Sequence, residues 1–161
     1  MSITDPPAAA VRSRRPSVAP HSARNVRPAR RRPAVLDESF DVDGLLRLRA
    51  TVTAHANALG AGPALDDIVL TAYELCSNAV KYGGGRGRIR IWRDGGRILC
   101  RVTDSGFGMV DPDRRGLEAP SPQATGGRGL WIARRLAEVQ IDTGPRGTNV
   151  TAAIQLAKRV S

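Results

Sequence analysis

The sequence predicts an α+β domain in which helices and hairpin-connected strands follow one another along a single chain. Three segments, 43–59, 63–82 and 130–137, carry apolar residues at three- and four-residue intervals, which is the period of an amphipathic helix. Other segments alternate apolar and polar residues on either side of short glycine turns, as β-hairpins do. The chain has 161 residues, enough for one such domain with its own core.

Residues 1–34 differ in composition from the rest of the chain. They hold six of the eleven prolines, show no apolar period, and carry eight arginines against one aspartate, a net charge of +7 out of a formal +10. Such a segment buries too little apolar surface to offset the entropy lost on ordering. We therefore predict a disordered basic arm over 1–34 and a folded domain over 35–161. The near-neutral body excludes a globally basic nucleic-acid-binding fold, so direct nucleic-acid contact is expected to be weak and confined to the arm.

The first half of the domain is predicted to contain a short strand and two helices. Residues 35–40 are compatible with a strand. The helix after Asp43 carries one apolar face, made of Leu45, Leu48, Val52, Ala56 and Leu59. Pro63 opens the second helix, where two early aspartates suit the positive end of the helix dipole. The buried stripe of this second helix is expected to consist of Leu65, Ile68, Val69, Ala72, Leu75 and Ala79.

The last two turns of the second helix are rich in polar side chains. Glu74 and Asn78 are four residues apart and project from one face, with Lys81 close by, before the chain reaches Gly83. A carboxylate, a carboxamide and an ammonium group in one place are suited to holding a metal ion and phosphates. The alternative is a solvated helix face with an ordinary C-terminal cap, and this segment alone does not decide between the two.

The second half is predicted to form two hairpins separated by a long loop and a third helix. Strands over 88–93 and 97–103 alternate apolar and polar residues across an Asp-Gly-Gly turn. Segment 110–125 has three prolines and no period, and a loop of this length is usually functional or mobile. In the third helix, Arg134 and Arg135 are expected to face solvent. This helix and the final hairpin occupy 130–137, 140–143 and 148–156.

Three motifs follow in a fixed order, each in the structural context that its chemistry needs. Glu-x-x-x-Asn closes a helix, Asp-x-Gly-x-Gly follows a strand at Asp104, and Gly-x-Gly precedes a helix at Gly127. A carboxylate at a strand end can accept a hydrogen bond from an exocyclic amine, and Gly106 and Gly108 allow a tight turn against a ligand. Backbone N–H groups at a helix start favour phosphates, and Asn78 offers an oxygen to a phosphate-bound Mg²⁺. Each motif alone is weak, but together they predict a nucleotide site.

The motifs resemble the N, G1 and G2 boxes of the GHKL ATP-binding family, which includes sensor histidine kinases, the Hsp90, gyrase and MutL ATPases, and the bacterial anti-sigma-factor serine kinases. The matching segments are Glu74–Gly83, Asp104–Met109 and Gly126–Leu130, and Gly147-Thr148 resembles a short Gly-Thr element that helps to seat adenine. The resemblance covers about residues 36–157. It implies the Bergerat fold: a two-layer α/β sandwich, with three helices on one face of a mixed, mostly antiparallel sheet and residues 110–126 as a lid over ATP.

The resemblance also implies roles for single residues, by matched position. Asp104 would read the adenine amine, Asn78 would hold Mg²⁺, and Lys81 would neutralise phosphate charge. Glu74 stands where the family places its acid–base carboxylate. The other nucleotide-binding residues that the resemblance implies are Tyr82, Gly106, Gly108, Met109, Gly127, Arg128, Gly129, Leu130 and Thr148.

Within the family, a helix before the N box and a short lid make the chain most similar to the stand-alone anti-sigma-factor serine/threonine kinases. The resemblance then implies a small antagonist protein as substrate and a sigma factor as a bound partner, with a homodimer as a further candidate. Lys81-Tyr82 and Met109 look more like the histidine-kinase boxes. Two alternatives therefore stand: a non-catalytic, nucleotide-dependent partner-binding module, and a detached histidine-kinase catalytic domain acting on a His of another protein.

The cysteines and the hydropathy pattern bear on the compartment. Cys76 and Cys100 lie in apolar stretches without a CxxC partner or a neighbouring His, so two reduced core thiols are expected. No apolar run is long enough to span a bilayer, and Arg14-Arg15 is not followed by the apolar stretch of a twin-arginine signal. These observations predict a cytoplasmic protein with no membrane partner.

Overall fold

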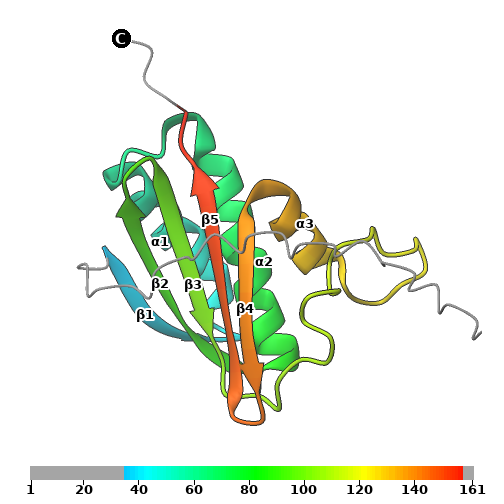
Figure 1. The fold of residues 1–161 in the computed structure, drawn as a ribbon. Coiled ribbons are helices and arrows are strands. Elements are labelled where there is room, and N and C mark those ends of the chain that lie inside the picture. The colour runs from blue at the N-terminus through cyan, green and yellow to red at the C-terminus, as the bar shows by residue number, and fades with distance from the viewer. Residues whose placement is uncertain (1–34, 158–161) are drawn as a thin grey trace, which may run out of the picture. The chain divides into compact units, whose positions relative to one another are not determined.

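The computed structural model describes residues 35–157, which contain three α-helices, one short 3₁₀ helix and five strands (Figure 1). The predicted disordered arm over 1–34 lies outside the described residues. In chain order the elements are β1 (Leu36–Asp41), α1 (Leu45–Ala58), η1 (Gly62–Ala64), α2 (Leu65–Tyr82), β2 (Arg86–Asp94), β3 (Arg97–Thr103), α3 (Arg128–Leu136), β4 (Glu138–Gly144) and β5 (Gly147–Gln155).

The five strands form one sheet in the order β1-β2-β3-β5-β4, and Figure 1 shows all three helices on one face of it. The predicted two-layer α/β sandwich is therefore confirmed. The prediction of a mixed sheet is wrong in one respect, because each of the four described strand pairings is antiparallel and this part of the chain contains no parallel pair. Two of these pairings are the hairpins β2–β3 and β4–β5, whose short glycine turns were predicted from the sequence.

The core lies between the helices and the facing side of the sheet. On α2 the predicted stripe is buried at Ile68, Ala72, Leu75 and Ala79, and it is partly buried at Leu65 and Val69. The facing strands contribute the residues expected from their alternation, namely Ile89 and Ile91 in β2 and Ile98, Cys100 and Val102 in β3. Each fully buried Val, Leu or Ile side chain of this core stabilises the fold by about 1.5–3 kcal/mol.

Both cysteines are free thiols buried in this core, as predicted. Burial raises the pKa of the Cys100 thiol to about 12. The pKa of the Cys76 thiol is raised well above its ordinary value, again mainly by burial. Because the thiolate is the reactive form, neither side chain is available for redox or nucleophilic chemistry at neutral pH.

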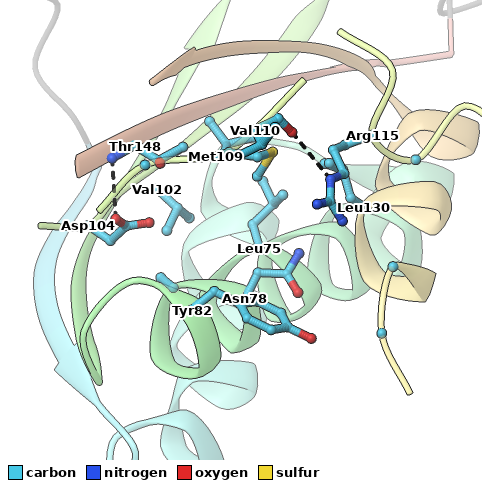
Figure 2. A pocket seen from close by; sticks show the side chains of 16 residues that line it. Leu75, Asn78, Tyr82, Val102, Asp104, Met109, Val110, Arg115, Leu130 and Thr148 are labelled. Atoms are coloured by element: carbon cyan, nitrogen blue, oxygen red, sulfur yellow. Dashed lines mark hydrogen bonds between the residues drawn. The ribbon is translucent and has the colours of Figure 1, made fainter. Parts of the chain in front are cut away.

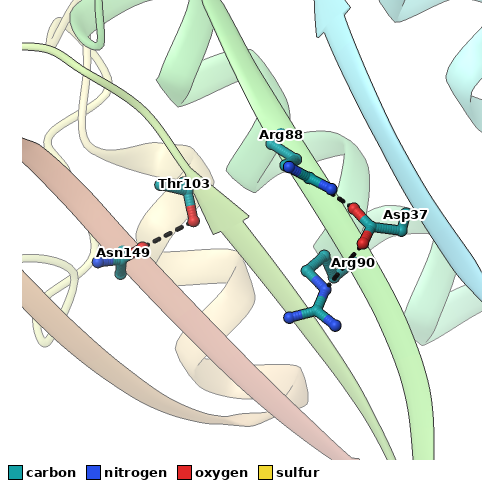
Figure 3. Close-up of polar contacts among 5 residues, drawn as sticks. All are labelled: Asp37, Arg88, Arg90, Thr103 and Asn149. Carbon is teal, nitrogen blue, oxygen red and sulfur yellow. Dashed lines mark hydrogen bonds and ion pairs between the residues drawn. The ribbon is translucent and has the colours of Figure 1, made fainter. Parts of the chain in front are cut away.

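Among residues 35–157 no helix covers the opposite face of the sheet, and polar contacts on this face join neighbouring strands (Figure 3). The Asp37 carboxylate on β1 accepts a hydrogen bond of 2.6 Å from Arg88 Nε and lies 3.2 Å from Arg90 Nε, both on β2. The hydrogen bond from Arg88 is the main cause that lowers the pKa of the Asp37 carboxyl. Farther along the sheet, the Thr103 hydroxyl donates to Asn149 Oδ1 at 2.7 Å, joining β3 to β5. Among residues 35–157, no helix is long and apolar enough to cross a membrane.

Candidate functional site

A cavity of about 390 Å³ opens between α2, the adjoining ends of β3 and β5, the start of α3 and segment 104–127 (Figure 2). Its volume lies in the range of small-molecule sites. Thirteen residues were predicted from the sequence to form the site, and eight of them line the cavity: Asn78, Tyr82, Asp104, Gly108, Met109, Gly127, Leu130 and Thr148. The other five predicted residues, which do not line it, are Glu74, Lys81, Gly106, Arg128 and Gly129.

Asp104 stands at one end of the cavity, directly after β3. Its backbone continues the sheet, because Asp104 N donates to Thr148 O at 2.9 Å. Its carboxylate Oδ1 accepts from the backbone N–H groups of Gly106 at 3.0 Å and Thr148 at 3.2 Å. Figure 2 shows the second carboxylate oxygen directed toward the cavity. Asp104 therefore presents a fixed hydrogen-bond acceptor, the group needed to recognise an exocyclic amine.

Three glycines allow the chain to close around Asp104. A Cβ on Gly83 would collide with the Asp104 side chain, and one on Gly147, where φ is +137°, would collide with the Asp104 carbonyl oxygen. A Cβ on Gly106 would come within 2.7 Å of Gly83 Cα. Gly106 was predicted to give room to a ligand, whereas the structure shows it buried against the end of α2, where a side chain would not fit.

Gly108 and Met109 place the next part of the segment against β4. A Cβ on Gly108 would lie 2.5 Å from the carbonyl oxygen of Gly144, so this glycine also serves close contact within the protein. The Met109 N–H donates to Thr143 Oγ1 at 2.8 Å, and this hydroxyl lies 2.9 Å from the hydroxyl of Thr148. The hydroxyl pair connects the backbone of the segment to the cavity wall, and Thr143 was missed in the sequence analysis.

The middle of the cavity is apolar. Its lining there comes from α2, β3, β5, α3 and the segment, through Leu75, Val102, Val150, Leu130 and Met109. Figure 2 shows Leu75 and Met109 between Asp104 on one side and Arg115 and Leu130 on the other. An apolar space that ends at a carboxylate fits a flat heteroaromatic ring carrying an amine.

The far end of the cavity is formed by the start of α3 and by Asn78. Gly127, the residue before α3, adopts the left-handed conformation with φ +89°, and α3 has no side-chain cap. The first N–H groups of a helix have no partner within it, so they attract anions such as phosphates. Arg128 and Gly129 were predicted to precede the helix, but both lie in its first turn.

Glu74 and Asn78 converge on Gly129 from α2. A Cβ on Gly129 would lie 2.6 Å from Glu74 Oε2 and 3.3 Å from Asn78 Oδ1, so only glycine lets the two helices approach here. Glu74 is thus half-buried against the first turn of α3, beside Asn78, which lines the cavity. The helix pair brings together a carboxylate, a carboxamide and unpaired helix N–H groups, as the sequence motifs predicted.

These oxygens fit a magnesium ion that arrives with phosphates. Among residues 35–157 there is no cluster of three His, Cys, Asp or Glu side chains that could hold a metal ion alone. Mg²⁺ usually keeps several waters and binds through one or two protein oxygens together with substrate phosphates, so such a cluster is not required. Asn78 Oδ1, with the Glu74 carboxylate beside it, would hold the ion, whose charge would neutralise phosphate oxygens.

The charged residues that line the cavity differ from the prediction, because Asp104 is the one predicted charged residue among them. Lys81 is exposed and does not line the cavity, whereas Arg115, in the segment after Met109, does. Asp104 and Arg115 are the two charged side chains of the lining in the described part of the chain, and Figure 2 shows them on opposite sides. Arg115 could not be predicted, because the segment has no period from which to infer which side chains face inward.

Residues 39–154 match the histidine kinase-like ATPase domain family. Over 67 residues the chain is 37% identical to the DNA mismatch repair protein MutL of Acidobacterium capsulatum. This stretch covers 42% of the present chain and only 10% of the length of that relative.

Several solved structures are similar in fold. The histidine kinase domain of a blue-light activated histidine kinase from Erythrobacter litoralis aligns at 19% identity with a TM-score of 0.48, covering 73% of this chain and 68% of the other. The mycobacterial sensor histidine kinase MprB aligns at 18% identity with a TM-score of 0.48, covering 75% of this chain and 98% of the other.

Proposed function

The chain belongs to the histidine kinase-like ATPase domain family, and on that premise we propose that it is an ATP-dependent protein kinase of the anti-sigma-factor type. It transfers the γ-phosphoryl group of ATP to a Ser or Thr of a small antagonist protein and holds a sigma factor as an alternative partner. The observation that carries the proposal is one cavity with the Asp104 carboxylate at one end and with the start of α3 and Asn78 at the other. Glu74 lies beside Asn78 against Gly129, just outside the lining.

ATP fits this cavity in one orientation. The adenine ring lies in the apolar middle and donates its amine hydrogen to Asp104, whose other oxygen is already held by two backbone N–H groups. The phosphates then extend to the first turn of α3, where Gly127 and the following N–H groups receive them. Guanine has a carbonyl oxygen in place of the adenine amine, and two acceptors facing each other repel, so GTP is rejected.

In this proposal Glu74 accepts the proton of the attacking hydroxyl, as the family resemblance implies. In the transfer step, the Ser or Thr oxygen forms a bond to the γ-phosphorus while the bond from that phosphorus to the bridging oxygen breaks and ADP leaves. The hydroxyl proton passes to the Glu74 carboxylate. Most of the rate comes from positioning and from neutralising the phosphate charge, as in other phosphoryl transfers. Asn78 would hold a Mg²⁺ ion, which would supply part of this neutralisation.

Calorimetry with Mg²⁺ and ATP tests the pocket. Asp104→Asn is expected to weaken ATP binding by about tenfold or more and to reduce the preference for ATP over GTP, because a hydrogen bond to a charged group is lost. Asn78→Ala is expected to weaken Mg²⁺-dependent binding. Asp113→Asn is the matched control, since Asp113 is an exposed acid of the same segment that does not line the cavity. A folded wild type that does not bind ATP would contradict the proposal.

The phosphoacceptor is tested by transfer of labelled phosphate to candidate antagonist proteins. A serine or threonine product survives acid treatment, whereas phosphohistidine does not. Acid-labile product would instead establish the detached histidine-kinase function. ATP binding without transfer to any partner, unchanged in Glu74→Gln, would favour the non-catalytic partner-binding module.

A further inference from the structure

Segment 110–127, which forms one wall of the cavity, contains no helix or strand. The Arg134 side chain on α3 forms two hydrogen bonds with the backbone of this segment. Arg134 Nε donates to the carbonyl oxygen of Arg115 at 2.7 Å, and its Nη2 donates to the carbonyl oxygen of Pro112 at 3.0 Å. The sequence analysis expected Arg134 to face solvent, and this is wrong: the side chain is half-buried under the segment.

A glycine brings the same part of the segment directly onto the first turns of α3. Gly116 has φ +75°, and a Cβ there would lie 2.8 Å from the carbonyl carbon of Leu130 and 2.9 Å from the Trp131 nitrogen. No other residue allows this approach without displacing backbone. The backbone of Arg115 is therefore fixed from two sides, by the Arg134 guanidinium at its own carbonyl and by the packing of the next residue on α3.

This anchored backbone directs the Arg115 side chain along the cavity. Its Nε donates to the carbonyl oxygen of Val110 at 3.3 Å, and Figure 2 shows the rest of the guanidinium beside Leu130, on the side of the cavity away from Asp104. Arg115 is the one basic side chain that lines the cavity among residues 35–157, and no carboxylate of that part of the chain forms an ion pair with it. A guanidinium in this position has donors to spare for an anionic ligand.

We infer that Arg115 binds the distal phosphates of the nucleotide and that Arg134 is a positioning residue that keeps it there. The inference rests on the proposed function, because it needs ATP in the orientation given above. It assigns to Arg115 the charge-neutralising role that the sequence suggested for Lys81. Since the guanidinium lies at the phosphate end, it contributes to ATP binding and not to binding of the nucleoside.

Two matched pairs of variants test this inference by calorimetry with ATP and with adenosine. Arg115→Ala is expected to weaken ATP binding by about tenfold or more and to leave adenosine binding unchanged, because a charge-assisted contact to phosphate is lost. Arg114→Ala is its control, since Arg114 and Arg115 are both exposed but Arg114 does not line the cavity. Arg134→Ala and the milder Arg134→Gln are expected to act in the same direction. Their control is Arg135→Ala, because Arg135 is exposed and its Cζ lies 5.4 Å from the centroid of the Trp131 ring, away from the segment's backbone contacts.

The double variant Arg115→Ala with Arg134→Ala separates positioning from general support of the fold. If Arg134 acts through Arg115, the double variant binds ATP about as well as Arg115→Ala alone. Additive losses, or an equal loss of adenosine affinity in Arg134→Ala, would overturn the positioning role. Full ATP affinity in Arg115→Ala would overturn the whole inference while leaving the proposed function standing. Only a folded wild type without ATP binding removes both.

Discussion

The two walls of the cavity, α2 and segment 110–127, are built in different ways. The helix spans 18 residues and buries five apolar residues, which are Ile68, Ala72, Leu75, Cys76 and Ala79. The segment is of similar length, has no regular structure, and keeps Val110 and Leu117 exposed to solvent. Its described attachments are the two hydrogen bonds from Arg134, the close approach of Gly116, and the Met109 N–H bonded to Thr143 just before it begins.

This difference separates a preformed wall from one that a ligand can adjust. The buried Ile68 and Leu75 side chains of α2 each contribute about 1.5–3 kcal/mol, whereas a hydrogen bond such as those of the segment contributes about 0.5–1.5 kcal/mol net. Regions with few buried apolar contacts open locally at a lower free energy than the core. Asp104 and Asn78 therefore form the fixed part of the site, and Arg115 belongs to the part whose position depends on a few polar contacts.

The largest effect on stability is expected from truncating a buried side chain of α2. Ile68 is completely buried on α2, so Ile68→Ala should lower the free energy of unfolding by about 2–5 kcal/mol through lost burial and a residual cavity. Leu46→Ala is the matched control, because Leu46 on α1 is 85% exposed and its truncation should change stability by about 0.5 kcal/mol or less. Chemical denaturation measures both. Equal effects would contradict the packing described for α2.

The second largest effect is expected at the ends of β3 and β5, where Gly147 allows Asp104 to pair with Thr148. Gly147→Ala places a Cβ onto the Asp104 carbonyl oxygen at a φ of +137°, so it should cost about 1–3 kcal/mol in stability and displace the carboxylate. Gly144→Ala, in the same hairpin, meets nothing within 4 Å and should be nearly neutral. Thermal unfolding and ATP affinity of the two variants should diverge. A Gly147→Ala protein as stable as Gly144→Ala would show that the junction tolerates a side chain.

The fixed wall was also the part that could be predicted from the sequence. The stripe of α2 and the alternation of β3 follow from local periodicity, and the prediction of a strand over 97–103 coincides with β3. The structure places β4 two residues earlier than predicted, because only Ala137 separates it from α3 and no turn residue marks the boundary. Asn78 and Asp104 were found because each stands at a fixed place relative to a periodic element.

The adjustable wall escaped prediction for the same physical reason. Nothing in the sequence of segment 110–127 distinguishes Arg115 from the adjacent Arg114, because a side chain's direction in an irregular loop is set by long-range contacts. Here those contacts come from Arg134, 19 residues away. Thr143 was missed because its contact with Thr148 depends on the pairing of β4 with β5. The need for glycine at position 106 also depends on long-range packing, because an added Cβ would meet Gly83 at the end of α2.

A smaller effect is expected from the link between the segment and β4. Thr143→Val keeps the shape of the side chain but leaves the Met109 N–H without its hydroxyl acceptor, so stability should fall by about 1 kcal/mol. Hydrogen exchange of the Met109 amide should accelerate, while the amides in the middle of α2 keep their protection. Unchanged exchange at Met109 would mean that the segment is held mainly by Arg134 and Gly116.

The smallest effect is expected from Asp37→Asn on the face of the sheet without helices, where polar contacts are open to solvent (Figure 3). Arg88 lowers the pKa of the Asp37 carboxyl, chiefly by donating a hydrogen bond to it, so the folded state favours its charged form. The resulting stabilisation is present above the ordinary pKa of an aspartate, about 3.9, and is lost as the pH falls through the lower folded value. The wild type and the variant should therefore differ slightly in denaturant midpoint near neutral pH and converge in acid or at high salt. A denaturant-midpoint difference that persisted in acid would show that the Asp37 side chain stabilises the pairing of β1 with β2 by something other than its charge.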